Sequence, residues 1–503
     1  MKRRYVASAA LLCLASLNAS RIAAAQAAPA AAPTQAQPWK SIPIPPLAPF
    51  HPAQPKRIVL KNGVVIFLAE NHELPFIGGF VEMRGGSRNE PAAKVGLVDL
   101  YGDVWRTSGT TTQNGDKLDD ILEAKAAKVE TGGDVDSTSV GWNCLKQDED
   151  QVFGIVLDLL EHPAFSEQKL NLSKQQMAAG IVRRNDSAGQ IAGREAAALV
   201  YGAASPYART PEIATVMSVT VADLKAWHDR TFIPNGMIIG VSGDFDSAAM
   251  EQTLRAAFEG LPQGAPIQEP KEDFPGPKPG VYFVEKSDVN QSNIRIVGLG
   301  TERNNPDYFS LSLMNEIFGT AGNFSTRLTQ ELRTKLGLVY DVRSSLGAAY
   351  DHPGIFEVAA STKSLTTVDT AQAMLDEIKA LKTRPFTEDE LKRAKDQILN
   401  SFIFSYDSID KVLYEQARLE FYGYPLDFLA KYRDAVEKVT TADLERVANK
   451  YIDPSKLAIL VVGNSSGFGK PLSKLGPVKT LDVTIPVPPG MAGPHGPGAG
   501  QDQ

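Results

Sequence analysis

Cysteine and histidine are scarce in this chain of 503 residues, which has two cysteines and six histidines. The two cysteines, Cys13 and Cys144, are too few for a disulfide framework. The closest two histidines are 21 residues apart, so no pair lies one helical turn apart as two zinc ligands on one helix would. The sequence also lacks a Walker loop, a G-x-G-x-x-G run after a strand and a G-x-S-x-G elbow. Composition and spacing therefore leave the function open.

An excess of basic charge is also missing, because 52 Lys and Arg face 59 Asp and Glu, which gives a formal net charge of −7. Such a chain has no general attraction to phosphate or to anionic lipid, so nucleic acid is not expected as a partner. A hydrophobic fraction of 43% excludes a wholly disordered chain. The length allows about three domains at roughly 100–200 residues each.

The N-terminus has the pattern of a signal peptide over residues 1–25. Three basic residues at positions 2–4 precede an apolar run over 6–19, and the small residues of 22–28 offer cleavage sites. The alternative is a membrane anchor, but the run is shorter than the roughly 20 apolar residues that a spanning helix needs. No later segment is long and apolar enough to cross a bilayer. The sequence therefore predicts an exported protein, which we expect in the periplasm.

Segments rich in proline and glycine divide the rest of the chain. Residues 26–55 contain nine prolines and are predicted to be a spacer. Residues 262–280 have the composition of an interdomain linker, and residues 476–503 that of a disordered tail. Two segments of similar length remain, 56–261 and 281–475, which we call the first half and the second half.

The two halves end alike. Residues 219–243 and 439–463 align without a gap and share nine identities in 25 positions. Each segment predicts a helix that begins after an N-capping threonine (Thr220 or Thr440), then a turn marked by proline, then a buried strand. We interpret the halves as duplicated α+β domains.

Within each half, hydrophobic periodicity predicts further elements. Residues 57–70 carry two strands around an Asn62-Gly63 hairpin turn. The pattern also predicts strands over 76–84, 281–286 and 292–300, and helices over 116–130, 150–162 and 307–318.

Residues 57–96 and 96–110, the latter reading GLVDLYGDVWRTSGT, resemble the pitrilysin (insulinase) family of zinc peptidases, to which mitochondrial processing peptidase belongs. The likeness runs from about residue 56 to 475. It implies two pitrilysin-like domains, each an antiparallel-rich sheet packed against helices, which together form one half of a clamshell chamber.

The resemblance implies that the zinc site is degenerate. Active members carry the inverted motif H-x-x-E-H, in which two histidines bind zinc and the glutamate polarises the attacking water. Asp99, Gly102 and Asp103 occupy those positions, and the third ligand position falls on Gly180. Gly102 cannot act as a general base, and Gly180 cannot bind a metal. Asp99 and Asp103 share a helix face and could hold a hard cation with waters, or they are simply solvated acids.

Residues 318–342 resemble the family's second-domain motif, a loop followed by L-R-x6-Y. In active members this Arg–Tyr pair binds substrate near the scissile bond, and Arg333 and Tyr340 match it here. Arginine offers fixed N–H donors, and a phenol can donate to a peptide carbonyl or its oxyanion. In the structural alternative, Arg333 closes a helix and Tyr340 begins a buried strand.

The sequence therefore predicts a chain without catalytic residues of its own, the substrate-binding subunit of an exported two-chain zinc metalloendopeptidase. No cofactor is expected in this chain, and zinc is expected in a partner chain with an intact motif. An extended peptide would add to a sheet edge near Lys128–Asp136. Two alternatives remain open: a structural or peptide-binding scaffold with no role in proteolysis, and a homodimer that binds peptides without cleaving them.

Overall fold

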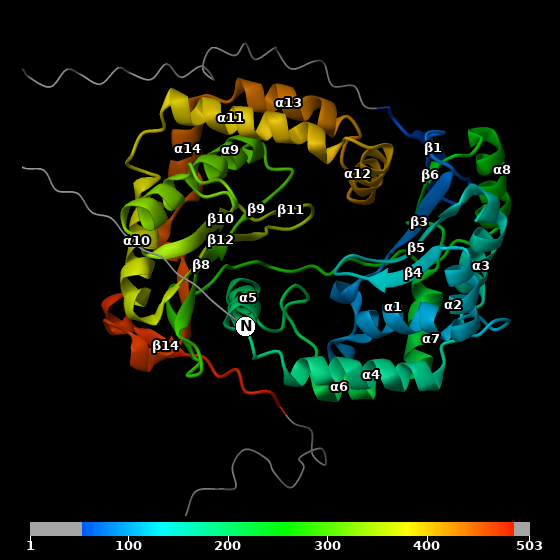
Figure 1. The fold of residues 1–503 in the computed structure, drawn as a ribbon, viewed down its shortest axis with the longest axis horizontal. Coiled ribbons are helices and arrows are strands. Elements are labelled where there is room, and N and C mark those ends of the chain that lie inside the picture. Colours follow the sequence, from blue (N-terminus) through cyan, green and yellow to red (C-terminus); the bar gives the residue numbers. More distant parts are fainter. Residues whose placement is uncertain (1–52, 487–503) are drawn as a thin grey trace, which may run out of the picture. The chain divides into compact units, whose positions relative to one another are not determined.

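Two six-stranded sheets form the framework of the chain (Figure 1). The structure, a computed structural model, describes residues 53–486. The predicted signal peptide, most of the 26–55 spacer and residues 487–503 lie outside the described residues. Within the described part of the chain, no helix combines the length and the apolarity that crossing a membrane requires.

Sheet 1 belongs to the first half and has the strand order β1-β2-β6-β3-β5-β4. Its strands are β1 (Lys56–Val59), β2 (Val65–Glu70), β3 (Phe76–Arg84), β4 (Lys128–Gly133), β5 (Ser137–Leu145) and β6 (Ile238–Gly243). Only β2 and β6 pair in parallel. The predicted strand over 76–84 and the hairpin around Asn62-Gly63 are confirmed, and Gly63 has the positive φ of 99° that such a turn favours.

Helices cover one face of sheet 1 and bury its main core. They are α1 (Leu97–Ser108), α2 (Gly115–Ala124), α3 (Glu149–Glu161), α4 (Glu167–Val182), α6 (Ile213–Ser218), α7 (Val221–Thr231) and α8 (Ser247–Phe258). The predicted helix over 150–162 is confirmed as α3. The helix predicted over 116–130 is too long, because α2 ends at Ala124 and residues from Lys128 pair with β5 as strand β4. Ala126, with a φ of 49°, reverses the chain between them.

Sheet 2 repeats this arrangement in the second half. Its order is β10-β12-β8-β13-β7-β14, and its first five strands follow the order of sheet 1 read from the other edge. The sixth strand differs, because β1 precedes β2 and pairs antiparallel with it, whereas β14 comes last in the chain and pairs in parallel with β7. Its strands are β7 (Gly280–Glu285), β8 (Gln291–Leu299), β10 (Val339–Ser345), β12 (Ile355–Lys363), β13 (Ala458–Gly463) and β14 (Val478–Thr480). A small parallel pair, β9 (Thr301–Glu302) and β11 (Ala348–Ala349), lies outside the sheet. The helices that follow in the chain are α9 (Tyr308–Phe318), α10 (Thr367–Ala380), α11 (Glu388–Phe402), α12 (Ile409–Phe421), α13 (Phe428–Lys438) and α14 (Thr441–Tyr451).

The duplicated segments fold alike, as their sequences predict. The Thr220 and Thr440 hydroxyls accept hydrogen bonds from the backbone N–H groups of Asp223 and Asp443. The carboxylates of these aspartates accept in turn from the backbone N–H groups of the threonines, which completes a capping box at the start of α7 and of α14. The strands that follow, β6 and β13, are central in their sheets. The mixed α+β fold with two related sheets is therefore confirmed, whereas the domain boundaries stay a prediction.

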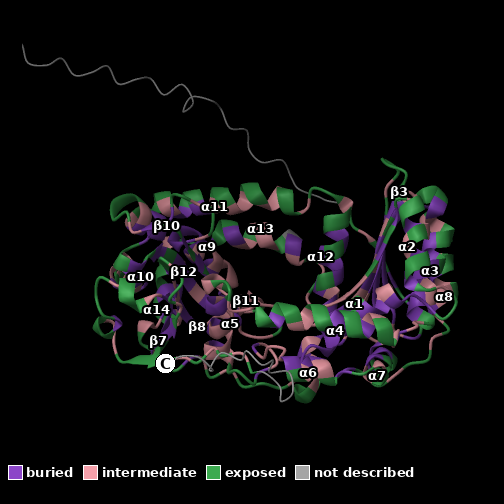
Figure 2. Ribbon diagram, turned by 60° about the horizontal axis from the view of Figure 1, so that its bottom comes forward, coloured by how far each residue is buried: buried purple, intermediate pink, exposed green. Residues whose placement is uncertain are grey.

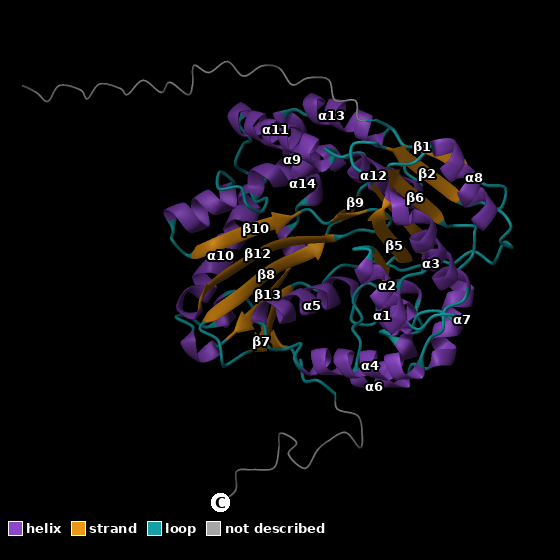
Figure 3. Cartoon of the chain, turned by 45° about the vertical axis from the view of Figure 1, so that its right-hand side comes forward, coloured by secondary structure: helices purple, strands orange, loops and turns teal. Residues whose placement is uncertain are grey.

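One helix from each half packs on the sheet of the other half. Helix α5 (Ala188–Tyr201), from the first half, packs on β8 and β13 of sheet 2 through a small core that includes Ile191, Ala196 and Leu460. Helix α12, from the second half, packs on β2 and β6 of sheet 1. Figure 3 shows α5 alongside the strands of sheet 2. In Figure 2 exposed residues colour much of α4 and α11, and buried residues gather in the strands around β3.

The linker and the tail both contribute contacts. Residues 262–279 form no helix or strand, as expected of a linker, yet Ile267 is buried and Phe274 packs against Tyr201. In the segment predicted as a disordered tail, Val478–Thr480 pair with β7 as β14. The carbonyl of Val483 also accepts a hydrogen bond of 2.7 Å from Asn185. Order therefore extends past residue 476.

Candidate functional site

Helix α1 carries the three altered motif positions, and a buried carboxylate holds its first turn. Glu90 accepts hydrogen bonds from the backbone N–H groups of Gly96 (3.0 Å) and Val98 (3.1 Å), two donors that have no partner within the helix. The negative charge also lies at the positive end of the helix dipole. The start of α1 is thus determined by Glu90 rather than by a residue of the motif.

The inner face of α1 is anchored by His228 of α7. His228 Nε2 donates to the carbonyl of Leu160 (2.9 Å), so Nδ1 is left to accept from the Tyr101 hydroxyl at 2.8 Å. Burial lowers the pKa of His228, which favours this neutral form. His228 therefore has a structural role in the buried core of the first half.

Gly102, at the position of the family's catalytic glutamate, is closed off by the backbone of β4. A Cβ atom at Gly102 would lie 2.9 Å from the Cα and carbonyl carbon of Gly132 and from the nitrogen of Gly133. The Thr131 hydroxyl donates to the Gly102 carbonyl at 2.5 Å, which holds helix and strand together. The loss of the general base is therefore more than a missing side chain, because the space beside Gly102 is filled.

The other altered positions lie at the surface. Asp99 and Asp103 are solvent-exposed on α1, although the protein around Asp99 partly desolvates its carboxylate and raises its pKa. Gly180 is exposed on α4 with no atom within 4 Å of the place a Cβ would take. No group of three or more His, Cys, Asp or Glu side chains within residues 53–486 is placed to hold a metal ion. The residues present do not fit the zinc ion that active members bind, since two carboxylates offer too few ligands.

Strand β4 is the outer strand of sheet 1, in the region where the sequence predicts a peptide-binding edge. One of its backbone acceptors is already used, because Arg106 Nε donates to the carbonyl of Val129 at 2.9 Å. The segment that follows turns back at Asp134, whose carboxylate accepts from the backbone N–H groups of Asp136 and Ser137. An edge is therefore present, and part of it is occupied by α1.

Arg333 and Tyr340 lie together at the matching edge of sheet 2. Arg333 belongs to a π-helix, η5 (Thr329–Lys335), and Tyr340 to the outer strand β10. The Arg333 guanidinium lies 4.6 Å from the centre of the Tyr340 ring and 4.7 Å from that of Phe324, so it is held between two aromatic rings. Tyr340 is 80% exposed and Phe324 63% exposed. The structural alternative, in which Tyr340 begins a buried strand, is wrong for its side chain.

The donors of the Arg333 guanidinium are unused. Within the described part of the chain, Arg333 makes neither a hydrogen bond nor an ion pair, and only the two rings fix its orientation. π-Helical turns are rare and are frequent at functional sites. Sequence comparison predicts the pair, but Phe324 could not be predicted from the Arg–Tyr spacing.

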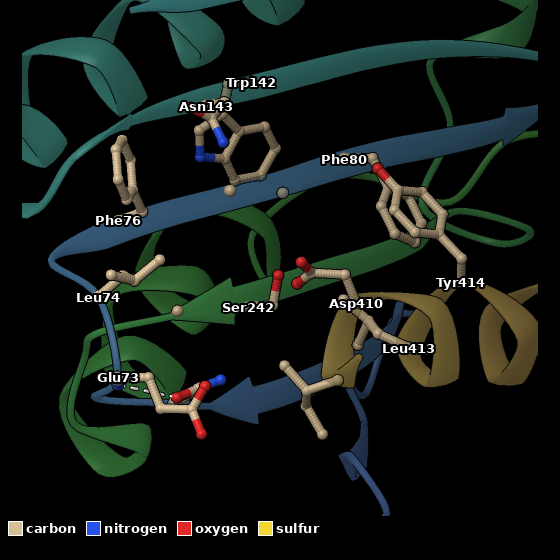
Figure 4. Close-up of a pocket in the computed structure, with 15 residues that line it drawn as sticks. Glu73, Leu74, Phe76, Phe80, Trp142, Asn143, Ser242, Asp410, Leu413 and Tyr414 are labelled. Carbon is tan, nitrogen blue, oxygen red and sulfur yellow. Dashed lines mark hydrogen bonds between the residues drawn. The ribbon is translucent and has the colours of Figure 1, made fainter. Parts of the chain in front are cut away.

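Two adjoining pockets on the other face of sheet 1 have no signal in the sequence. Phe80 of β3 and Tyr414 of α12 stack with ring centres 4.6 Å apart and line both pockets. The smaller pocket, about 310 Å³, lies near the start of α12, where Asp410 and Ser242 extend toward the same space (Figure 4). The larger, about 730 Å³, is lined by residues of β3, β5 and α12 and by Arg303. We call it the Arg303 pocket.

Comparison with known proteins finds a matching family model and relatives that are similar over most of this chain. Residues 218–398 match the family described as peptidase M16 inactive domain, which belongs to the pitrilysin family. The non-peptidase homolog YmxG of Helicobacter pylori is 23% identical over 412 residues, which are 80% of this chain and 92% of that protein. The uncharacterized zinc protease YmxG of Bacillus subtilis is 21% identical over 400 residues, 78% of this chain and 93% of that protein.

Two solved structures have a similar fold. The crystal structure of a peptidase M16 inactive domain from Pseudomonas fluorescens has a TM-score of 0.74 at 24% identity and covers 82% of this chain and 98% of that one. The crystal structure of a protease from Helicobacter pylori has a TM-score of 0.70 at 21% identity and covers 82% and 100%. The resemblance to the pitrilysin family and its fold is therefore confirmed.

Proposed function

We propose, because this chain is an inactive homologue of the M16 peptidases, that it is the non-catalytic, substrate-binding subunit of an exported two-chain zinc metalloendopeptidase. The partner chain carries the intact zinc motif and supplies zinc, water and general base. This chain closes the chamber that the two subunits enclose, and it brings Arg333 and Tyr340 to the partner's active site. The proposed location, the periplasm, rests on the N-terminal sequence pattern alone.

The observation that carries the proposal is the state of Arg333. A guanidinium held between two exposed rings, with its donors unused, is poised to bind a carbonyl, a carboxylate or an oxyanion. The exposed Tyr340 hydroxyl can donate to the same group. Binding energy used to align a peptide is a catalytic contribution even when the hydrolytic groups belong to another chain.

The packing at Gly102 supports the division of labour. A side chain long enough to reach a water molecule has no room beside Gly132 and Gly133. Hydrolysis beside α1 therefore needs a general base from another chain. An extended peptide adding to the free part of the β4 edge would meet α1 at the altered motif, which supports binding there without chemistry.

The test uses the complex of this chain with a chain that carries an intact H-x-x-E-H motif, and it measures kcat/KM on an unstructured peptide. Arg333→Ala is expected to lower kcat/KM about 10²-fold, as the loss of one donor to an oxyanion does. Tyr340→Phe is expected to lower it less. Arg343→Ala is the matched control, because Arg343 lies on β10 with Tyr340 and its one ion pair within the described residues is with Asp341.

Cleavage by the isolated chain would overturn the division of labour. Unchanged kcat/KM in both the Arg333 and Tyr340 variants would overturn their shared-site role. It would favour the second candidate, a structural or peptide-binding scaffold with no role in proteolysis. The two pockets on sheet 1, neither of which Arg333 lines, support that candidate. Native mass measurement would then distinguish a mixed dimer from a homodimer.

A further inference from the structure

The Arg303 pocket contains a cation with no charged partner. Arg303 follows β9, and its guanidinium lies 4.6 Å from the centre of the Tyr350 ring and 5.6 Å from those of Tyr308 and Phe428. One of its terminal nitrogens donates to the Tyr350 hydroxyl at 2.6 Å. These contacts fix the plane and the position of the guanidinium, so it is preorganised for a planar acceptor.

Arg303 retains unused donors. Its Nε is buried without an acceptor, and no carboxylate among residues 53–486 pairs with it. Its other terminal nitrogen, Nη2, makes no hydrogen bond within these residues and is not buried, so it is the donor that a bound acceptor can reach. The pocket thus offers a position where a ligand's oxygen atoms gain more than they would at an exposed arginine.

The other cations that line the pocket are already paired. Lys411 lies 2.8 Å from a carboxylate oxygen of Asp407, and Arg418 pairs with Glu415. Arg303 is therefore the cation that remains for a ligand.

The acids of the pocket limit which anion fits. Asp134 accepts hydrogen bonds from its own turn, and burial raises the pKa of Glu82, so its repulsion of a second carboxylate is reduced. Glu415 Oε1 is buried without a donor. A ligand that brings N–H groups as well as a carboxylate suits a pocket that holds these acids beside Arg303, which a peptide does and a simple anion does not.

An internal comparison identifies what Arg303 lacks. The sequence Arg-Asn-x-Pro occurs at 88–91 and again at 303–306, between β3 and α1 in the first half and between β8 and α9 in the second, and β3 and β8 hold matching places in their sheets. Arg88 is 2% exposed and has three carboxylate partners: Asp136 at 2.9 Å, Glu269 at 2.8 Å and Asp351 at 2.6 Å. Arg303, at the corresponding position, has three aromatic rings and no carboxylate.

We propose that the Arg303 pocket is a binding site for a carboxylate group of an extended peptide, either an acidic side chain or the free C-terminus. The aromatic rings of Tyr406, Tyr414 and Phe80 surround the chain that carries the carboxylate, and Arg303 binds its oxygens. The inference rests on the proposed function insofar as the ligand is a peptide, but it needs neither zinc nor the partner's active site.

The test measures binding to the isolated full chain by fluorescence anisotropy. The probe is a short labelled peptide of Gly, Ser and Ala with a central Asp, compared with the Asn peptide, each with a free or an amidated C-terminus. Wild-type protein is expected to bind the peptide that carries the recognised carboxylate about tenfold or more tightly than the peptide with none, as a charge-assisted hydrogen bond requires. Weaker binding on amidation alone identifies the C-terminus, and weaker binding with Asn alone identifies the side chain.

Variants assign the effect to Arg303. Arg303→Gln is expected to abolish the preference for carboxylate, and Arg303→Lys to retain part of it. Arg183→Gln is the control, because Arg183 is 79% exposed and pairs only with Asp186. Circular dichroism and thermal unfolding check that each variant is folded.

Equal binding of all the peptides by wild type, or an unchanged preference in a folded Arg303→Gln protein, would overturn the inference. If the complex with a catalytic partner still cleaves peptide in that case, the proposed function stands without this subsite. If the isolated chain binds none of the peptides, the inference is overturned, and cleavage by the complex then decides the proposed function separately.

Discussion

Arg88 and Arg303 occupy equivalent places in the two halves, and their surroundings differ completely. Arg88 is buried among three carboxylates: Asp136 in the turn before β5, Glu269 in the linker and Asp351 in the second half. Arg303 is stacked among rings and faces a pocket. The two are connected, because Tyr422 donates to Asp136 beside Arg88 and stacks on Tyr350 beside Arg303, with ring centres 4.5 Å apart.

The same contrast separates the two edge strands. At β4 the helix α1 lies against the strand, so that Gly102 has no space beside it. At β10 the Tyr340 ring is exposed, and the half-buried Arg333 guanidinium beside it has unused donors. The β4 edge is thus partly occupied by α1, whereas the Arg333 donors beside β10 are available to another molecule. This difference is consistent with the proposed role, in which the chain binds substrate for a catalytic partner.

The largest expected effect is the difference in stability between variants of the two arginines. Arg88→Met leaves three carboxylates close together without their cation, so the free energy of unfolding is expected to fall by about 3–5 kcal/mol. Arg303→Met strands no carboxylate and is expected to cost less than about 1 kcal/mol. Urea denaturation of both variants measures the difference. Equal losses would mean that Arg303 has a structural ion partner after all.

Acid is expected to weaken the Arg88 cluster next. Burial alone would raise the pKa of Asp351, but hydrogen bonds from His352 and Arg88 outweigh it and lower that pKa to about 2. A carboxylate with a lowered folded-state pKa stabilises the fold above its unfolded pKa near 4. That contribution, about 2 kcal/mol, is lost as the pH falls from about 4 to 2.

The variant Asp351→Asn removes the titrating group from this cluster. Its stability, measured by denaturation between pH 2 and 6, is expected to change less with pH than that of the wild type. The same slope in both proteins would contradict the role given to Asp351.

The two altered glycines are expected to respond in opposite directions. Gly102→Ala places a methyl group 2.9 Å from three backbone atoms, and the strain of about 1–3 kcal/mol exceeds the gain of about 1 kcal/mol in helix propensity. Gly180→Ala meets no atom within 4 Å and is expected to stabilise the chain by up to about 1 kcal/mol. Melting temperatures of the pair test this, and stabilisation by Gly102→Ala would show that β4 can move away from α1.

The smallest expected effect is at Phe324. Since its ring is mostly exposed, Phe324→Ala is expected to leave the melting temperature unchanged. It removes one of the two rings that orient Arg333, so kcat/KM of the complex is expected to fall about 2- to 5-fold, as an exposed cation–π contact of about 0.5–1 kcal/mol implies. Leu336→Ala is the control, another exposed apolar residue near Arg333 in the chain. An equal loss in both variants would show a general surface effect.

The sequence alone predicts much of the local structure correctly. The strand over 76–84, the helix over 150–162 and the capped helices after Thr220 and Thr440 depend on periodicity and on capping by near neighbours. The helix predicted over 116–130 is wrong at its end. Lys128–Gly133 pairs with β5 as strand β4, and this pairing outweighs the helical periodicity of those residues. Helical spacing cannot reveal a strand partner.

By itself, the sequence determined that Gly102 cannot act as a general base and that the side chain of Gly180 cannot bind a metal, since a glycine has no side chain in any fold. It also determined the duplication. Only the tertiary structure decided that β4 closes the space at Gly102, and that α5 packs on sheet 2 and α12 on sheet 1. It also decided that the arginines of the two Arg-Asn-x-Pro segments have different surroundings. Their counter-ions and rings come from residues far along the chain, and long-range packing, rather than the four-residue pattern, brings those groups together.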